Sequence, residues 1–93
     1  MLRRVPVRGT GSVRLTFTLP LDSPPGPVSV VGDFNSWRPG AHVLARRSNG
    51  IRSASVTVAA GTTLRFRYLG SDGLWFDDQH ADAVDSAGSL VSV

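Results

Sequence analysis

The chain has 93 residues, with ten arginines, seven aspartates, no cysteine and a formal net charge of +3. A single domain of this size buries only about 60–65% of the surface of its unfolded chain. The lack of cysteine excludes a disulfide framework, and no apolar run approaches the roughly 20 residues of a membrane-spanning helix. No apolar segment of signal-peptide length follows the basic start, so we expect a cytoplasmic protein without a membrane segment.

Residues 1–12 carry Arg3, Arg4 and Arg8 together with Pro6 and two glycines. We expect an irregular basic arm here, ahead of one folded domain over residues 13–93. A solvated terminus is the simpler interpretation, and contact of the arginines with nucleic acid stays open as an alternative. The high isoelectric point follows from arginine being always protonated, and it does not by itself predict a polyanionic partner.

Short apolar runs between turn signals fill the rest of the chain. Residues 13–19 and 64–69 alternate apolar and polar side chains, as a strand with one buried face does. The prolines of residues 20–27 interrupt regular structure, and Asn49-Gly50 is a hairpin signal. We expect about seven strands and no helix, which predicts an all-β sandwich of two antiparallel sheets. The expected strands are 13–19, 28–32, 42–46, 51–58, 64–69, 74–77 and 90–93.

Arg52 interrupts an otherwise apolar row in the strand expected at 51–58. Its row-mates Ala54, Val56 and Val58 share one face of that strand. We expect Arg52 at the rim of the sheet, with its aliphatic stem packed and its guanidinium in water.

Two tryptophans stand next to turns. Trp37 follows a strand that ends at Gly32, where Asp33 and Asn35 can hydrogen-bond their own backbone in a tight turn. Trp75 follows the hairpin signal of residues 70–73. A neutral sugar offers no charge, so its binding site must contact the flat apolar face of the ring, which an exposed indole can do. The competing interpretation is that one or both indoles fill the core.

These tryptophans lie within motifs that are known elsewhere. Residues 32–37 read Gly-Asp-Phe-Asn-Ser-Trp and resemble the Gly-x-Phe-Asn-x-Trp signature of the early-set carbohydrate-binding domains. That group includes the family 48 carbohydrate-binding modules, the amino-terminal domain of isoamylases and branching enzymes, and the glycogen-binding domain of the AMP-activated kinase β-subunit. Residues 72–75 (Asp-Gly-Leu-Trp), then Asp78 and Ala81-Asp82, resemble the hairpin that follows in these domains. The resemblance covers residues 13–93 and implies an immunoglobulin-like early-set β-sandwich.

The resemblance also implies a function, namely non-catalytic binding of an α-glucan polysaccharide such as glycogen or starch, without a cofactor. It places Trp37 and Trp75 on glucose rings. Arg67 stands where kinase-associated members have a lysine that hydrogen-bonds sugar hydroxyls, and Arg65 has the same role with weaker support. Because the family's domains are generally attached to larger proteins, the partner in trans would be an α-glucan-processing enzyme or a kinase-type complex.

The sequence departs from the family near the last strand. Gly88 stands where family members often have a sugar-contacting asparagine, and the preceding loop is a few residues shorter. The nearest polar substitutes are Asp85, Ser86 and Ser89, which we include as candidate glucan contacts. This departure favours an alternative function, a protein–protein adaptor that keeps the sandwich and has lost sugar binding.

An acidic cluster, Asp77, Asp78 and Asp82 with His80, is the remaining candidate for chemistry. The ligands are too few, and their spacing too irregular, for a calcium or transition-metal site. Adjacent carboxylates on a strand point to opposite faces, so Asp77 and Asp78 make a poor acid–base pair for glycoside hydrolysis. We therefore expect neither a metal nor an enzyme, and we expect Asp78 and Asp82 to hold the loop through hydrogen bonds.

Overall fold

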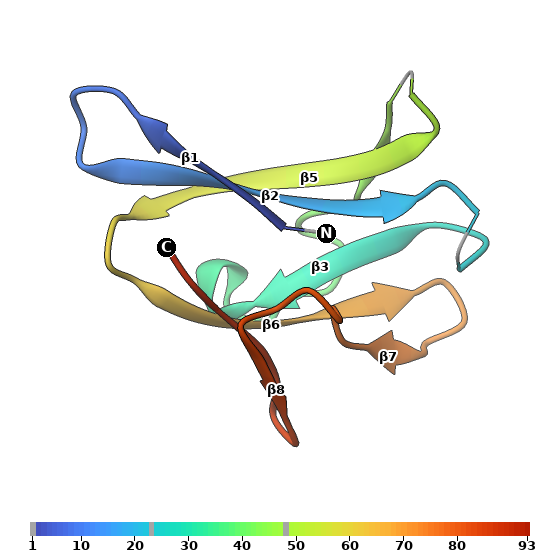
Figure 1. The fold of residues 1–93 in the computed structure, drawn as a ribbon. Coiled ribbons are helices and arrows are strands. Elements are labelled where there is room, and N and C mark those ends of the chain that lie inside the picture. Colours follow the sequence, from blue (N-terminus) through green and yellow to red (C-terminus); the bar gives the residue numbers. More distant parts are fainter. Residues whose placement is uncertain (1, 23, 48) are drawn as a thin grey trace.

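The structure is a computed structural model that describes residues 2–22, 24–47 and 49–93. These residues form nine strands and one 3-10 turn, arranged in two layers (Figure 1). No helix in these ranges has the length and apolar character needed to cross a membrane. The elements are β1 (Leu2–Val7), β2 (Ser12–Pro20), β3 (Val28–Gly32), η1 (Asp33–Asn35), β4 (Ala45–Arg46), β5 (Ile51–Ala59), β6 (Thr63–Gly70), β7 (Trp75–Phe76), β8 (Ala83–Asp85) and β9 (Gly88–Ser92).

The strands form two antiparallel sheets, which confirms the expected all-β sandwich. The first sheet has the order β1-β2-β5-β4, and the second has the order β3-β6-β9-β8 with β7 paired to β6. In Figure 1 the layer of β1, β2 and β5 lies above the layer of β3, β6 and β7. We call these the β2 sheet and the β6 sheet.

The prediction of an irregular arm over residues 1–12 is wrong. Leu2–Val7 forms β1, which pairs with β2 over its full length from Leu2 opposite Phe17 to Val7 opposite Ser12. Pro6 is compatible with this strand because β1 lies at the sheet edge, where a missing N–H costs no ladder hydrogen bond. Leu2–Val7 therefore belongs to the β2 sheet.

The expected strand over residues 42–46 divides between the sheets. The His42 carbonyl accepts from the Val30 amide, and the Leu44 amide donates to the Val28 carbonyl, both at 2.9 Å, which extends the edge of β3. Residues 45–46 then pair with β5 as β4. This segment crosses from one sheet to the other and closes one side of the sandwich.

The core is built from the inward residues of both sheets. Leu64, Phe66 and Tyr68 alternate along β6 and are buried, opposite the fully buried Phe17 of β2. The Phe17 ring lies 4.9 Å from Phe66, edge to face, and 5.5 Å from Phe34 of η1. Each such pair contributes about 0.5–1.5 kcal/mol beyond the burial of its area. Phe34 thus fixes the turn after β3 against the core.

Arg52 departs from the expectation of a rim residue with its guanidinium in water. Its side chain is buried, and the two terminal nitrogens donate to the carbonyls of Pro24 and Gly26, each at 2.6 Å. Burial lowers the pKa of Arg52, and the charge of Asp22 partly opposes this change. The sequence could not indicate this, because the carbonyls come from a proline-rich loop 26 and 28 residues away.

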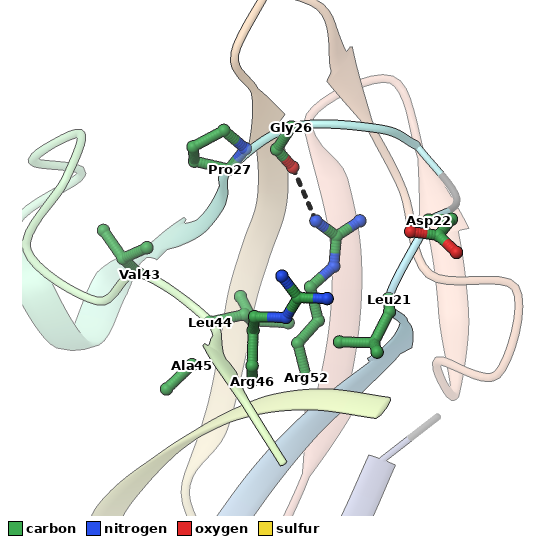
Figure 2. A pocket seen from close by; sticks show the side chains of 9 residues that line it. All are labelled: Leu21, Asp22, Gly26, Pro27, Val43, Leu44, Ala45, Arg46 and Arg52. Carbon is green, nitrogen blue, oxygen red and sulfur yellow. Dashed lines mark hydrogen bonds between the residues drawn. The ribbon is translucent and has the colours of Figure 1, made fainter. Parts of the chain in front are cut away.

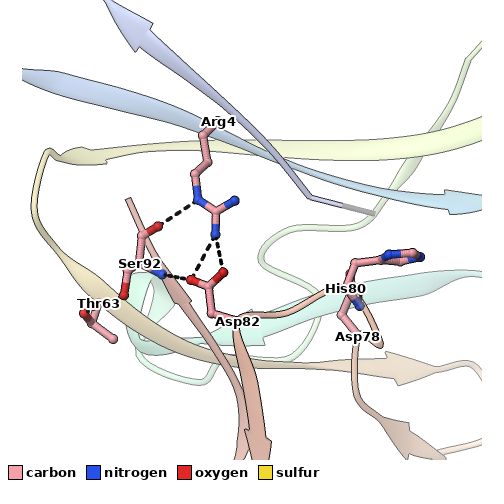
Figure 3. A network of polar contacts seen from close by, with 6 residues as sticks. All are labelled: Arg4, Thr63, Asp78, His80, Asp82 and Ser92. Atoms are coloured by element: carbon pink, nitrogen blue, oxygen red, sulfur yellow. Dashed lines mark hydrogen bonds and ion pairs between the residues drawn. The ribbon is translucent and has the colours of Figure 1, made fainter.

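The free edge of β1 is joined to the other sheet by Asp82 (Figure 3). Its carboxylate accepts two hydrogen bonds from Arg4 at 2.9 and 3.0 Å and one from the Ser92 amide at 2.7 Å. Arg4 also donates to the Ser92 carbonyl at 2.7 Å. The Ser92 amide lowers the pKa of Asp82 most, burial acts in the opposite direction, and Arg4 lowers it further.

We predict that Asp82→Asn destabilises the fold in a pH-dependent way. Because the folded pKa of Asp82 lies below its unfolded value, the carboxylate stabilises the protein above about pH 4 and this contribution is lost as the pH falls through the folded pKa. The melting temperatures of wild type and variant should differ most near pH 7 and converge in acid. A difference that is the same at every pH would contradict this role.

Candidate functional site

The turn after β3 is held by the side chain of Asn35. Its Oδ1 accepts from the Gly32 amide at 3.0 Å, and its Nδ2 donates to the Val30 carbonyl at 3.0 Å. Gly32 has no room for a side chain, since a Cβ there would lie 2.5 Å from the Arg65 carbonyl oxygen and 2.8 Å from the Phe66 Cβ. The turn therefore lies directly against β6.

This turn places Trp37 at the surface in a strained backbone conformation. Ser36 and Trp37 have φ angles of 56° and 57°, a left-handed region that bulky residues rarely adopt. The Trp37 amide donates to the Gly32 carbonyl at 3.0 Å, which holds this conformation. The side chain remains 36% exposed. Strain of this kind costs about 1–3 kcal/mol per residue and gathers at functional sites.

Asp33 connects the Trp37 indole to β6. One carboxylate oxygen accepts from the Trp37 Nε1 at 3.1 Å, and the other accepts from the Arg65 amide at 2.9 Å. Both bonds involve a charged acceptor and are stronger than neutral ones. From the sequence we expected Asp33 only to form the turn. The spacing of four residues between Asp33 and Trp37 is the signal that could have indicated their contact.

Trp75 is exposed on the second hairpin. It pairs with Leu69 of β6, and its neighbour Phe76 pairs with Tyr68. The Phe76 ring packs 5.2 Å from the buried Tyr68 ring, so alternation along β7 directs Trp75 to the opposite, outer face. Trp75 is 43% exposed. Both tryptophans thus reach the surface, as expected, and neither fills the core.

Arg65 and Arg67 lie on the outer face of β6. Asp33 contacts the strand at the Arg65 amide and Trp75 pairs with it at Leu69, so Arg67 lies between these two points. The Arg65 guanidinium pairs with Asp85 at 3.0 Å. The Arg67 guanidinium donates to the Ser86 carbonyl at 2.7 Å, and its Nε lies 3.4 Å from Asp77. The candidate residues Arg65, Arg67, Asp85 and Ser86 therefore come together at the β8–β9 turn. We call the outward-facing residues Arg65, Arg67, Leu69 and Trp75 the outer β6 face, to which Trp37 is linked through Asp33.

Gly88, at the position where the resemblance led us to look for an asparagine, is enclosed by this arrangement. Its φ is +135°, and a Cβ there would lie 2.9 Å from the Phe66 carbonyl oxygen and 3.3 Å from the Cγ atoms of Arg65 and Arg67. The arginine stems thus take the space into which a side chain at this position would project. Glycine at this position permits the close approach between β9 and β6.

Ser89 is not part of this surface, which corrects its inclusion among the candidate contacts. It is fully buried, and its hydroxyl accepts from the Asp78 amide and donates to Asp77, both at 3.0 Å. The register explains the difference, because Ser89 lies opposite Phe66 and points inward. Its role is to hold the loop after β7.

Asp78 is buried within the same loop and has the structural role that the sequence suggested. Its carboxylate accepts hydrogen bonds from the Tyr68 hydroxyl at 2.6 Å and from the His80 amide at 2.8 Å. Figure 3 shows Asp78 and His80 side by side in this loop. Burial, and then the hydrogen bond to Asp78, raises the pKa of Tyr68 well above its ordinary value. Within the described ranges no group of three or more histidine, cysteine or acidic side chains is arranged to hold a metal ion.

The comparisons with known proteins give one likeness to report. Over 50 residues, which are 54% of its length, the chain is 44% identical to the 1,4-alpha-glucan branching enzyme of Salinibacter ruber. The chain spans 8% of the length of that enzyme. No protein-family profile matches the chain. The likeness fits the type of domain that the two tryptophan motifs resemble.

We predict that a side chain at position 88 destabilises the protein. Gly88→Ala combines backbone strain with overpacking against β6, whereas Gly40→Ala, at a φ of +80° with no atom within 4 Å, brings strain alone. Strain lowers the free energy of unfolding by about 1–2 kcal/mol in Gly40→Ala and by at least as much at the larger φ of Gly88, and overpacking lowers it by about 1–3 kcal/mol more in Gly88→Ala. Urea unfolding measures both values. Equal losses would show that position 88 has room.

Proposed function

We propose that this chain is a non-catalytic module that binds α-glucans on the outer β6 face. The two indoles would stack on glucose rings, and Arg67 would hydrogen-bond hydroxyls between them. The observation that carries the proposal is the attachment of both exposed tryptophans to β6, Trp75 by strand pairing and Trp37 through Asp33. The likeness to part of a glucan branching enzyme supports the same class of ligand.

The spacing of the attachment points suits an extended ligand. Asp33 contacts β6 at Arg65, and Trp75 pairs with Leu69, so the two points are four residues apart. That separation is about 13 Å along a strand, with the Arg67 side chain at its midpoint. A single sugar ring cannot span this length, so the proposed ligand is an oligomer with at least one ring on each indole.

The site should bind weakly. A stacked ring gains roughly 1 kcal/mol from close contacts plus a burial term, and exchanging hydrogen bonds to water for hydrogen bonds to protein gives little net free energy. We expect a dissociation constant between about a micromolar and a millimolar. Multivalent attachment through a partner protein would then raise the effective affinity for a polysaccharide.

A second candidate function is a protein–protein adaptor. The polar groups of the outer β6 face are already engaged, Arg65 with Asp85 and Arg67 with Ser86 and Asp77. A sugar would have to share these donors or replace their partners. In addition, the outer face of the β2 sheet presents Arg3 and Arg14 without any aspartate on its strands, so it suits an acidic protein surface.

We predict that Trp37→Ala and Trp75→Ala each weaken the affinity for amylose by about 5- to 30-fold, the equivalent of about 1–2 kcal/mol for one stacked ring. The measurement is affinity electrophoresis in gels containing amylose, followed by calorimetry with a linear α-1,4-linked gluco-oligosaccharide. Val5→Ala is the matched control, because Val5 is an exposed apolar residue of the opposite sheet.

Retention of both tryptophan variants at the wild-type level would contradict stacking. Absence of retention for the folded wild type would favour the adaptor. In that case the Arg3→Ala and Arg14→Ala variants should lose binding to an acidic protein partner.

A further inference from the structure

A pocket that is separate from the proposed glucan site lies beside β3, on the side of β3 that faces away from β6 (Figure 2). It has a volume of about 470 Å³ and lies between the loop after β2 and the segment that crosses between the sheets. Its apolar walls include Leu21, Pro27, Val43 and Leu44. A pocket of this size accommodates a small organic molecule.

Arg52 forms the deep side of this pocket. The side chain is 4% exposed, and each terminal nitrogen uses one N–H on a loop carbonyl, at Pro24 and Gly26. Its Nε is buried without a hydrogen-bond partner. Of the five N–H donors of a guanidinium, two are engaged on these carbonyls, and the residues that the structure describes give it no further hydrogen bond. Among the described contacts the hydrogen bonds of Arg52 go to neutral carbonyls, and Asp22 acts on its charge without forming an ion pair, so this buried cation favours a closer negative partner.

Arg46 brings a second positive charge to the same place. It lies directly opposite Arg52 in the pairing of β4 with β5, and Figure 2 shows both guanidinium groups in the pocket. Within the described part of the chain the Arg46 side chain forms no hydrogen bond or ion pair, and the residue is exposed. Like charges opposite each other destabilise a strand pair. Asp22 also lines the pocket, but neither arginine forms an ion pair with it among the described contacts, and the three charges sum to +1.

From this arrangement we infer that the pocket binds a small organic phosphate monoester. The planar guanidinium matches phosphate oxygens in pairs, and two such groups can share the three outer oxygens of one phosphate. A carboxylate has only two oxygens and fills one guanidinium. The apolar walls contact the organic part of the ligand, and the phosphate removes the repulsion between Arg46 and Arg52.

The test uses phenyl phosphate as the probe, with benzyl alcohol as its neutral counterpart and benzoate as the carboxylate. The amide signals of Gly26, Val43 and Ala45, which line the pocket, are followed by NMR during titration. Phenyl phosphate should shift these signals to saturation with a lower dissociation constant than benzoate. Benzyl alcohol should leave them unchanged.

Arg46→Ala removes one guanidinium at an exposed position of an edge strand, where Arg52 and the loop carbonyls stay in place. It should weaken phenyl phosphate binding by at least about tenfold, the effect of losing a hydrogen bond to a charged group. Arg14→Ala removes the same charge from the exposed outer face of the β2 sheet and should leave binding unchanged. Equal weakening by both variants, or no saturable shift in the wild type, would overturn the inference. Neither result bears on retention by amylose, so the two sites are tested separately.

Discussion

The alternation of side chains along β6 is the constraint on which both the core and the candidate site depend. Leu64, Phe66 and Tyr68 point into the sandwich. The rings of Phe66 and Tyr68 pack edge to face against Phe17 of the other sheet. The residues between them must then point outward, which places Arg65 and Arg67 on the opposite face. A one-residue change of register would exchange the two sets, so the stability of the core and the geometry of the surface are the same property of one strand.

The neighbours of β6 complete the surface from both sides. The turn after β3 approaches closely enough to exclude a side chain at Gly32 and is linked to β6 through Asp33. On the other side, the β8–β9 turn holds the two arginines through Asp85 and Ser86. The guanidinium groups are therefore already oriented in the proposed glucan site. Such preorganisation lowers the entropy that a ligand must lose on binding.

Local patterns were enough to predict the parts of the fold in which neighbouring residues decide the structure. The alternation of residues 13–19 and 64–69 predicted β2 and β6, and the turn signals predicted that both tryptophans stand next to turns. The prediction was wrong where distant contacts decide. Residues 2–7 lack a clear alternating pattern and form β1 only because the edge of β2 is available. Burial of Arg52 and Ser89 likewise depends on partners from other strands and loops. The contact of Asp33 with β6 spans 32 residues and has no local signature.

The central proposal is that both indoles contact one α-glucan chain, and their own N–H groups report on it directly. The measurement is a titration of the folded protein with a linear α-1,4-linked gluco-oligosaccharide, followed by the indole Nε1–H signals of Trp37 and Trp75 in NMR spectra. The account predicts that both signals shift together with a single dissociation constant, while the amides of β1 and β2 stay unchanged. Shifts confined to the β2 sheet, or saturable binding that moves neither indole, would contradict it.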